Sequence, residues 1–450
     1  MYNIVVVDEK SKYRLRELAN MFLRASEFEF SVSGEPVTSD VDIDLTEVRD
    51  SLSQAQLLYD FLEKETSQSL AWGVLTGVRP VKLLTELIES NTKRKAIEIL
   101  KKDYRVSDEK IELLLDVYGT QCTVKQQASP PAIGLYIGIP FCPSRCSYCS
   151  FTSNIYSKDG SVRYINALER EMEATGLLMQ EKNWHAESIY IGGGTPTSLD
   201  NESFERFLSL VTAIFMNENT KEFTVECGRP DTIDSAKLLI IKKYGGNRIS
   251  INPQTMSDKT LAAIGRSHNA SQIQHAFKIA HTAGCDIINA DLIAGLPGES
   301  VEDFLRSLQK VIDLKPVNIT VHTLAVKRAS KLIEQDSDVA FRQAEAASQM
   351  VKEARSILGK VGYRPYYLYR QKHMAGNMEN VGYALPGTES LYNIRIMAEN
   401  QTIIALGAGG ISKIYYPDEN RLERIPNVAN YEIYIERIDD MIRRKEIGIQ

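Results

Sequence analysis

The chain has 450 residues, and 53 Lys and Arg stand against 59 Asp and Glu, which gives a formal net charge of −6. This charge argues against nonspecific nucleic-acid binding, which needs a basic surface. No apolar run reaches the ~18 residues of a membrane-spanning helix, and Asp8–Lys10 interrupts the short apolar run near the start. We therefore expect a cytoplasmic protein of two or three domains, without a membrane span, a signal peptide or a nucleic-acid partner.

The first 130 residues are predicted to form an α+β extension. Their apolar patterns indicate a strand over Asn3–Val7, an amphipathic helix over Ser11–Leu23, an acidic stretch at 39–44 and helical segments around Ser53–Lys64. A polar stretch with two prolines at 126–131 marks the end of this region.

One segment of the extension stands out, Leu75–Leu84 with the sequence LTGVRPVKLL. It combines a glycine-containing turn, the cation Arg79 and a proline at the expected first position of a helix. Proline is favoured there because that position needs no N–H donor, so a helix start explains the pattern. No function follows from these residues alone.

Three cysteines stand in one short segment, Cys142, Cys146 and Cys149, at the spacing Cys-x3-Cys-x2-Cys. Cysteine thiolates normally hold all four irons of a cubane iron-sulfur cluster, so three thiolates leave one iron open. A structural zinc site needs four protein ligands, and neither a second pair of cysteines nor a nearby histidine completes one. Disulfides are not expected in a reducing cytoplasm. The loop therefore predicts a 4Fe-4S cluster with one open iron.

Leu135–Phe141, with the sequence LYIGIPF, runs directly into this loop. Together the two segments resemble the opening of radical S-adenosylmethionine (SAM) enzymes, in particular the oxygen-independent coproporphyrinogen III oxidase-like family. The resemblance implies that SAM chelates the open iron, and that one electron from a donor such as flavodoxin or ferredoxin cleaves it to methionine and a 5′-deoxyadenosyl radical. It also implies that Tyr136 acts beside the three cysteines as a catalytic and cofactor-binding residue.

A predicted strand from Glu187 ends in the glycine run Gly192–Gly194, followed by Thr195. Glycines let a backbone approach a ligand closely and direct N–H groups at a carboxylate, although a tight strand-to-helix turn has the same composition. In the family that the chain resembles, this turn holds the methionyl end of SAM. The resemblance therefore implies Gly193, Gly194 and Thr195 as cofactor-binding residues.

Four polar residues in later segments complete the site that the resemblance implies. Glu226 ends a β-rich segment, Gln254 follows another, Arg266 lies in the connection after it, and Asp291 precedes the turn Gly295–Gly298. Each residue alone is weak support, but their order along the chain matches the family. The resemblance implies that all four contact SAM.

Six apolar runs of strand length alternate with amphipathic helical segments in the middle of the chain. The runs lie near Leu135–Phe141, Glu187–Gly192, Glu222–Cys227, Arg248–Asn252, Ile287–Leu292 and Asn318–Leu324, and the helices include Val162–Glu181, Glu202–Phe215 and Ser271–Ala283. This alternation predicts a parallel sheet, which we expect to form an incomplete (β/α)6 barrel over residues 131–326. Cofactors then belong at the C-terminal ends of the strands.

Residues 327–450 are expected to form an α+β region on the substrate side. Gly362–Lys372 carries four tyrosines and three cations. This combination suits a flat ring with carboxylates, such as a porphyrinogen or a heme, and also an amphipathic strand with solvated charges. Arg364 and Arg370 are candidates for orienting substrate carboxylates. His322, at the end of the sixth strand, is either a substrate contact or a structural histidine.

Leu75–Leu84 and Met374–Tyr383 resemble the HemZ-type branch of the family, the coproporphyrinogen dehydrogenases, so the resemblance covers nearly the whole chain. It implies a radical SAM oxidoreductase of heme biosynthesis. The implied reaction is the anaerobic oxidative decarboxylation of two propionates of coproporphyrinogen III, which gives protoporphyrinogen IX. The last stretch, Asn430–Lys445, is predicted to be an amphipathic surface helix.

Phe151 departs from the pattern of the best-known members. Decarboxylating members commonly have a fourth cysteine at this position, and often a histidine where Gly138 stands, whereas the heme-chaperone members have a phenylalanine at 151. Two alternatives therefore remain. One is a heme-binding chaperone in which the cluster and SAM are not catalytic, and the other is a radical SAM enzyme that methylates or opens another tetrapyrrole.

Overall fold

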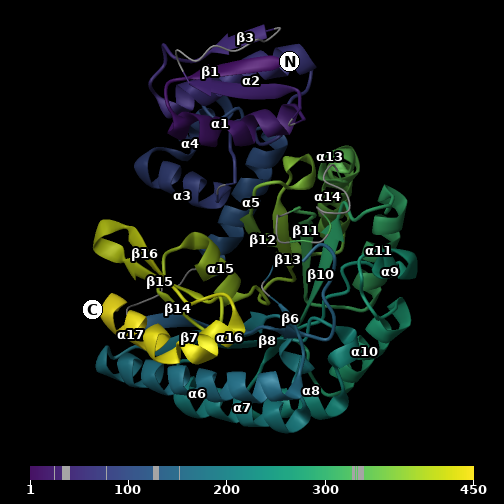
Figure 1. The fold of residues 1–450 in the computed structure, drawn as a ribbon. Helices are drawn as coiled ribbons and strands as arrows, with labels where there is room; N and C mark the ends of the chain where they lie inside the picture. The colour runs from purple at the N-terminus through teal and green to yellow at the C-terminus, as the bar shows by residue number, and fades with distance from the viewer. Residues whose placement is uncertain are drawn as a thin grey trace.

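The computed structural model describes residues 1–24, 26–32, 41–77, 79–124, 131–149, 151, 153–326, 330, 332 and 339–449. These residues form a small N-terminal unit, a layer of helices next to it and a large body around an 11-stranded sheet (Figure 1). The domain boundaries expected at residues 130 and 327 lie outside the described residues.

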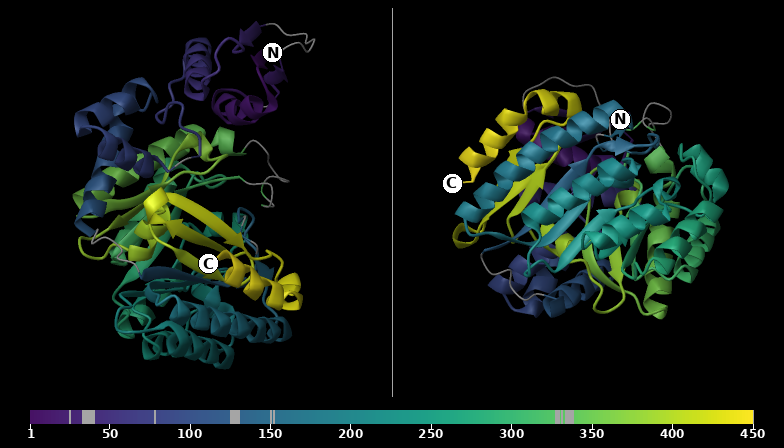
Figure 2. Two further views of the ribbon diagram at one scale, coloured as in Figure 1. Left: turned by 90° about the vertical axis from the view of Figure 1, so that its left-hand side faces the viewer. Right: turned by 90° about the horizontal axis from the view of Figure 1, so that it is seen from below.

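The N-terminal unit contains β1 (Tyr2–Val6), α1 (Glu9–Phe22), β2 (Phe28–Val32), β3 (Val41–Asp44) and α2 (Ser51–Thr66). Its strands are parallel, in the order β2-β1-β3. The strand predicted over Asn3–Val7 and the helix over Ser11–Leu23 are confirmed to within two residues. Leu18 of α1 and Leu58 of α2 pack with Ile4 in a core separate from that of the large body, and the unit stands apart from the large sheet (Figure 2).

Three helices join this unit to the large body, α3 (Pro80–Ser90), α4 (Lys93–Lys102) and α5 (Asp108–Val124). Their apolar faces, together with Trp72, belong to the core of the large body. Trp72 Nε1 and Lys110 Nζ each donate a hydrogen bond of 2.7 Å to the buried carboxylate of Glu379. Because a buried carboxylate needs its partners, this contact fixes the connecting helices to the C-terminal region.

Six parallel strands, adjacent to one another in the sheet, form the expected incomplete barrel. They are β4 (Ala132–Ile139), β7 (His185–Gly193), β8 (Glu222–Glu226), β9 (Arg248–Ser250), β10 (Ile288–Ala294) and β11 (Asn318–Thr323), and the helices between them are α6 (Lys158–Glu181), α7 (Asn201–Phe215), α8 (Ser235–Lys243), α9 (Asp258–Ala263), α10 (Ala270–Thr282) and α11 (Val301–Asp313). The predicted strands and helices are thus confirmed. The long helices α6 and α7 cover one face of the sheet, seen from below in Figure 2.

Each barrel helix buries one apolar stripe, and α7 shows how the sequence specifies it. Phe204, Phe207, Leu208 and Val211 follow the spacing i, i+3, i+4, i+7 and are all buried. Asp200 begins the helix, because its side chain accepts the N–H of Ser203 at 2.9 Å. A cap of this kind stabilises a helix by about 1 kcal/mol.

The C-terminal region extends the sheet at both edges. Its elements are α13 (Val339–Arg342), α14 (Ala344–Lys360), β12 (Arg364–Tyr369), β13 (Asn380–Ala384), α15 (Leu391–Ala398), β14 (Ile403–Leu406), β15 (Ile411–Tyr416) and β16 (Arg421–Pro426). β13 pairs antiparallel with β11 and β12, while β14 joins β4 in parallel and continues the sheet to β15 and β16. The two ends of the six-stranded barrel are therefore extended rather than joined to each other.

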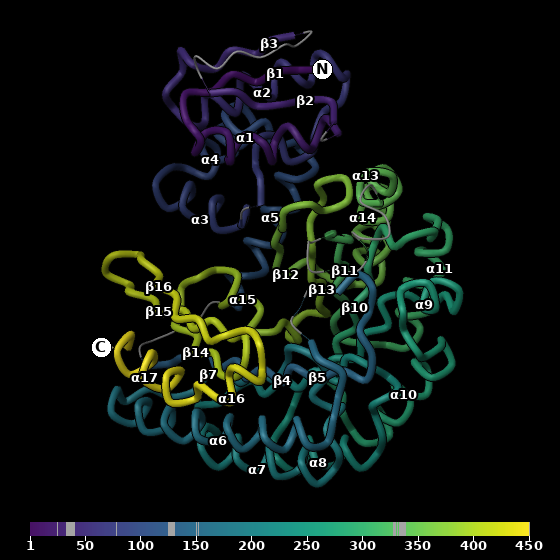
Figure 3. Tube along the Cα trace, in the orientation of Figure 1, coloured from purple at the N-terminus to yellow at the C-terminus, as the bar shows by residue number. Residues whose placement is uncertain are grey.

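Helix α15 lies between the two extensions of the sheet, near β12 and β14 (Figure 3). It contacts β12, β7 and α3. Glu222, at the start of β8, accepts hydrogen bonds from Leu391 N at 2.7 Å and from Ser390 Oγ at 2.8 Å. A carboxylate near the N-terminal end of a helix also interacts favourably with the helix dipole. Glu222 therefore fixes the first turn of α15 to the barrel.

The predicted surface helix over Asn430–Lys445 is instead two helices, α16 (Tyr431–Glu436) and α17 (Ile438–Gly448). Both pack against α6, and the break at Arg437 lets both reach the buried carboxylate of Glu171. Tyr434 Oη on α16 and Lys445 Nζ on α17 donate to it at 2.6 and 2.5 Å. The prediction of one surface helix is therefore wrong. The chain forms two helices here, and each donates a hydrogen bond to the buried carboxylate of Glu171 on α6.

We expect Lys445→Met to lower the free energy of unfolding by about 3 kcal/mol, because it leaves the Glu171 carboxylate buried without its charge partner. Lys243→Met is the matched control. Lys243 and its partner Glu205 are exposed, so this change should alter the free energy by less than ~1 kcal/mol. Urea unfolding of the cluster-free protein, followed by circular dichroism, measures both. Equal effects would contradict the role given to Lys445.

Candidate active site

A cavity of about 360 Å³ lies at the C-terminal ends of the barrel strands. All the residues predicted for the site except Tyr136 line it, namely Cys142, Cys146, Cys149, Gly193, Gly194, Thr195, Glu226, Gln254, Arg266 and Asp291. They come from segments far apart in the chain. The parallel order of the strands brings these segments to one end of the barrel.

The three cysteines follow a short strand, β5 (Phe141–Cys142), which pairs with β6 (Asn154–Ile155). Burial raises the pKa of the Cys142 thiol, the Thr195 hydroxyl 3.5 Å away lowers it, and the thiols of Cys149 and Cys146 raise it further. Among the described residues, no three His, Cys, Asp or Glu side chains converge on a point that suits a single metal ion. Cys142, Cys146 and Cys149 all line the same cavity, and in an iron-sulfur cluster each thiolate binds its own iron, so the three thiols suit such a cluster.

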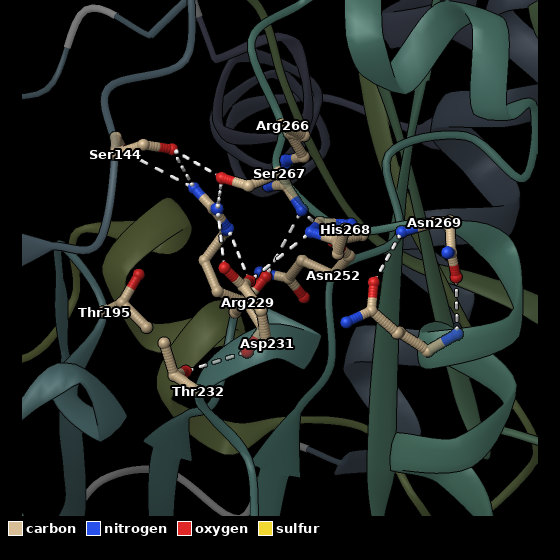
Figure 4. Close-up of polar contacts among 12 residues, drawn as sticks. Ser144, Thr195, Arg229, Asp231, Thr232, Asn252, Arg266, Ser267, His268 and Asn269 are labelled. Carbon is tan, nitrogen blue, oxygen red and sulfur yellow. Dashed lines mark hydrogen bonds and ion pairs between the residues drawn. The ribbon is translucent and has the colours of Figure 1, made fainter.

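Arg229 fixes the cysteine loop to the next strands (Figure 4). Its guanidinium donates to Ser144 Oγ at 3.0 Å and to Ser267 Oγ at 3.2 Å, and it forms a two-bonded pair with Asp231 at 3.0 and 2.9 Å. His268 Nδ1 lies 3.5 Å from the same carboxylate. We predicted no role for Arg229 from the sequence, although an arginine three residues after a strand end and two residues before an Asp was a usable signal.

The Gly192–Gly194 turn packs directly on the cysteine loop. Gly194 N donates to Ile139 O at 2.8 Å and Thr195 N donates to Phe141 O at 2.7 Å. The N–H of Gly193 is directed at the Glu226 carboxylate. These N–H groups therefore already have partners within the protein. Gly193 and Gly194 line the cavity, so a ligand bound there can contact the backbone of the turn.

Glu226, at the end of β8, is half-buried and lines the cavity next to the turn. Tyr190 Oη donates to its Oε1 at 2.5 Å. Burial raises the pKa of Glu226 to about 7, the hydrogen bond from Tyr190 lowers it, and the charge of Asp291 raises it again. The ring of Tyr190 stacks between Tyr392 of α15, at 4.6 Å, and Tyr136, at 6.2 Å. Tyr190 is thus a site residue that the sequence did not reveal.

Tyr136 lies beneath the glycine turn and does not line the cavity. Its Oη is 3.1 Å from the position that a Cβ on Gly193 would take. Burial raises the pKa of its phenol, and the charge of Glu226 acts in the same direction. The geometry gives Tyr136 a supporting position behind the turn.

Gln254 and Asp291 lie side by side on neighbouring strand ends. Gln254 has the left-handed φ of +67°, and its N–H donates to Asp291 O at 2.8 Å. The side-chain Oε1 of Gln254 is buried and has no hydrogen-bond partner. A buried polar atom without a partner is unfavourable by about 1–3 kcal/mol, so this atom is available for a ligand.

Asp291 also faces the far side of the cavity. Asn289 Nδ2 donates to its Oδ1 at 2.7 Å, and His322 Nε2 lies 3.5 Å from its Oδ2. Although burial raises the pKa of Asp291, the charge and hydrogen bond of His322 outweigh this and lower it. His322 in turn has its Nδ1 3.3 Å from Tyr369 Oη. The histidine predicted at the end of the sixth strand therefore connects the Asp291 carboxylate to the tyrosine-rich strand.

Arg266 is buried and already bonded. It donates to Asn252 O at 2.5 Å and to Tyr148 Oη at 3.2 Å, and Tyr148 lies within the cysteine loop. Among the described residues that line the cavity, Arg266 and Arg229 are the Lys and Arg side chains. Both stand on the cluster side of the cavity.

The tyrosine-rich strand β12 brings two of its tyrosines to the cavity. Tyr367 and Tyr369 line it, with parallel rings 6.3 Å apart, whereas Tyr366 is buried outside the lining and its Oη accepts a hydrogen bond from Asn393 Nδ2 at 3.1 Å. Arg364 and Arg370 do not line the cavity. Arg370 is buried and donates to Leu75 O at 2.6 Å, so its predicted role with substrate carboxylates is wrong.

Among the described residues, no helix combines the length and the apolar character that crossing a membrane requires.

Residues 136–311 match the radical SAM superfamily. The chain is 41% identical over 404 residues to the oxygen-independent coproporphyrinogen-III oxidase-like protein HemZ of Bacillus subtilis (strain 168), a match that covers 87% of this chain and 79% of that protein.

A second relative in Bacillus subtilis (strain 168) is the heme chaperone HemW, 30% identical over 277 residues, or 61% of this chain and 69% of that protein. Among solved structures, coproporphyrinogen III oxidase (HemN) from Escherichia coli, a radical SAM enzyme, matches with a TM-score of 0.57 and 22% identity over 72% of this chain and 73% of that one. A likeness at this identity shows a shared fold.

The raised pKa of Glu226 predicts a pH-dependent stability. An unfolded Glu titrates near 4.5 and the folded one near 7, so between these values the folded protein keeps a proton that the unfolded chain releases. Stability from this group therefore falls as the pH rises through that window. Glu226→Gln removes this titrating group. The free energy of unfolding of the variant minus that of the wild type should therefore rise from pH 5 to pH 8.

Urea unfolding at several pH values between 5 and 8 measures this difference. Glu205→Gln is the control. The hydrogen bond from Lys243 lowers the pKa of this exposed carboxylate, so its difference from the wild type should stay constant above pH 5. A constant difference for Glu226→Gln as well would contradict the prediction.

Proposed function

We propose that this chain, which belongs to the radical SAM superfamily and within it to the oxygen-independent coproporphyrinogen-III oxidase-like family, is a cytoplasmic oxidoreductase of heme biosynthesis. Its cofactors are a 4Fe-4S cluster and SAM. In the proposed reaction, two propionate side chains of coproporphyrinogen III become the vinyl groups of protoporphyrinogen IX without oxygen. A flavodoxin or ferredoxin is the proposed electron donor.

One observation carries this proposal, which is that a single cavity has two chemically different sides. The strands from β4 to β10 bring the three thiols, Glu226, Gln254 and Asp291 to the cavity, and β11, β13 and β12, which follow β10 in the sheet, bring His322, Asn380 and the paired tyrosine rings. The first side suits the cluster and SAM. The second suits a flat substrate with polar side chains.

In the proposed site, Cys142, Cys146 and Cys149 hold the cluster, and the carbonyl groups of the glycine turn accept from the ammonium group of SAM. Gln254 Oε1, buried without a partner, and the carboxylates of Glu226 and Asp291 accept from its other donors. When bound, these cofactors supply a 5′-deoxyadenosyl radical that removes a hydrogen atom from the substrate. Arg229 positions the cysteine loop and does not contact the reacting atoms.

The tyrosine side of the cavity positions the substrate in this proposal. Tyr367 and Tyr369 present two parallel rings, and the Tyr369 hydroxyl, with His322 and Gln371 beside it, can donate to propionate carboxylates. Loss of a hydrogen atom from the β-carbon, of carbon dioxide from the carboxylate and of one electron to an external acceptor converts each propionate to a vinyl group. The acceptor must reach the cavity from outside, because the chain supplies no second oxidant in this proposal.

Phe151 favours a second candidate, a heme-binding chaperone. It lines the cavity and is 67% exposed, so a large apolar surface stands beside the cysteine loop where a fourth cysteine would be. Exposed aromatic surface of this kind suits contact with a porphyrin ring. The 30% identity to a heme chaperone agrees with this reading. The remaining candidate is a radical SAM enzyme that methylates or opens a tetrapyrrole, and its substrate would bind in the same cavity.

A turnover experiment separates these functions. The cluster is reconstituted anaerobically, and SAM, dithionite and coproporphyrinogen III are added. We expect 5′-deoxyadenosine together with a product lighter by two carboxyl groups, both followed by mass spectrometry. Deoxyadenosine without that product would exclude coproporphyrinogen III and favour another tetrapyrrole. Neither product, with stoichiometric heme binding, would favour the chaperone.

The cluster ligands are tested separately by absorbance. Cys142→Ala should lose most of the absorbance near 400 nm and most of the bound iron and sulfide after reconstitution, because two thiolates cannot replace the three that the cavity presents. Cys122→Ala is the matched control, since Cys122 is exposed and lies on α5, and it should leave the spectrum unchanged. Iron and sulfide contents equal to those of the wild type in Cys142→Ala would overturn the cluster assignment.

A further inference from the structure

A second cavity, of about 330 Å³, lies outside the barrel between α3, α15 and the end of β15. Arg79 and Lys82 line it, and both belong to the segment Leu75–Leu84, which stood out in the sequence and has no part in the proposed reaction. Leu368, Met397 and other apolar side chains form part of its wall. Its volume is at the lower end of small-molecule sites, which start at about 300 Å³.

The two cations that line this cavity, Arg79 and Lys82, share one carboxylate with two further cations that do not line it. Glu399, the residue that ends α15, pairs with Arg79 Nη1, with Lys82 Nζ at 3.6 Å, with Lys413 Nζ at 3.3 Å and with Arg424 Nη2 at 3.3 Å. Within the described residues, every ion pair of these cations goes to Glu399. One carboxylate offers few acceptor positions, so the cluster holds more positive charge than its own acid can neutralise.

The mutual repulsion of these cations is visible in their ionisation. Burial lowers the pKa of Lys413 to about 7, and the charges of Arg79, Arg424 and Lys82 lower it in the same direction. Burial and the charge of Arg424 also lower the pKa of Arg79 to about 10. An additional anion would relieve this repulsion.

The other charged residues of the cavity stand apart from this cluster. Glu86 and Glu89 line the wall, but both are exposed and follow Lys82 by one and two turns of α3. Water screens exposed carboxylates strongly. The cavity is therefore lined by two half-buried cations and two exposed carboxylates, and an anionic group is favoured beside the cations.

The start of α3 adds to the attraction for an anion. Arg79 is the N-cap of this 11-residue helix, and no side chain caps its free N–H groups. Arg79 and Val81, at the start of this helix, line the cavity. The positive end of the helix dipole therefore lies at the cavity wall. Asn400 also lines the cavity, and its Oδ1 is buried without a partner. Rotation of this side-chain amide by 180° would present its NH2 group in place of the oxygen.

We propose that this cavity is a second ligand site, which binds a small molecule through a carboxylate or phosphate group held by Arg79 and Lys82. The apolar wall receives the rest of the ligand, and the volume limits it to a molecule smaller than a tetrapyrrole. The proposal is independent of the reaction in the barrel, because the cluster and SAM contribute nothing to the second cavity.

The test is isothermal titration of the cluster-free full-length protein at low ionic strength, in one arm with inorganic phosphate and in the other with succinate. We expect one saturable site per chain in at least one arm, and the arm that saturates identifies the anionic group. Lys82→Gln should weaken the affinity for the anion that saturates about tenfold, because one charge-assisted hydrogen bond is lost. Lys243→Gln, which removes an exposed lysine on α8, should leave the affinity unchanged.

Glu399→Gln distinguishes a ligand site from a structural ion cluster. If the cations bind ligands, removal of the internal carboxylate frees them and should strengthen binding several-fold. If they serve only to hold Glu399, the affinity will not rise, and that result overturns the proposal. The proposal also fails if neither probe saturates or if Lys82→Gln binds like the wild type. Lys82 is half-buried, and its 3.6 Å contact with Glu399 is the longest of the four ion pairs to this carboxylate. The Lys82→Gln variant should therefore fold. Turnover measured in parallel reports on the barrel site separately.

Discussion

The site depends on the lack of space around the glycine turn after β7. A Cβ atom on Gly192 would lie 2.7 Å from Cδ of Glu226, and one on Gly194 would lie 2.5 Å from the carbonyl oxygen of Phe141. Real side chains do not tolerate such distances, so β7, β8 and the start of the cysteine loop can meet only around glycines. Backbone packing therefore sets the separation between the thiols and the Glu226 carboxylate, and the protein holds this arrangement before a ligand binds.

The sequence allowed the barrel and most of its lining to be predicted, because both depend on local patterns. The six strands are apolar runs, the helices have one apolar stripe, and the predicted ligands stand at strand ends. Arg229 was missed because its importance arises from Ser144 and Ser267, which are distant in the chain. The pairing of β14 with β4 was missed for the same reason. Arg370 was misplaced because composition does not reveal which cation in a tyrosine-rich strand is buried.

Buried carboxylates repeatedly join parts of the chain that are distant in sequence. Glu379 binds Trp72 and Lys110 of the N-terminal side, Glu222 binds the first turn of α15, and Glu171 binds both terminal helices. Each charge is unfavourable when its partners are absent, so an incorrectly docked segment leaves an unpaired charge behind. This makes the docked arrangement specific, whereas apolar packing alone tolerates small shifts.

Position 254 places two opposing demands on the residue that occupies it. The backbone is in the left-handed region at φ +67°, which is unfavourable by about 1–2 kcal/mol for a residue with a side chain and is held by hydrogen bonds to β10. Glycine would remove this strain but also the amide oxygen that faces the cavity, and asparagine tolerates the backbone but has a shorter side chain. Few residue types meet both demands, so we expect relatives that bind the same ligand to vary little at this position.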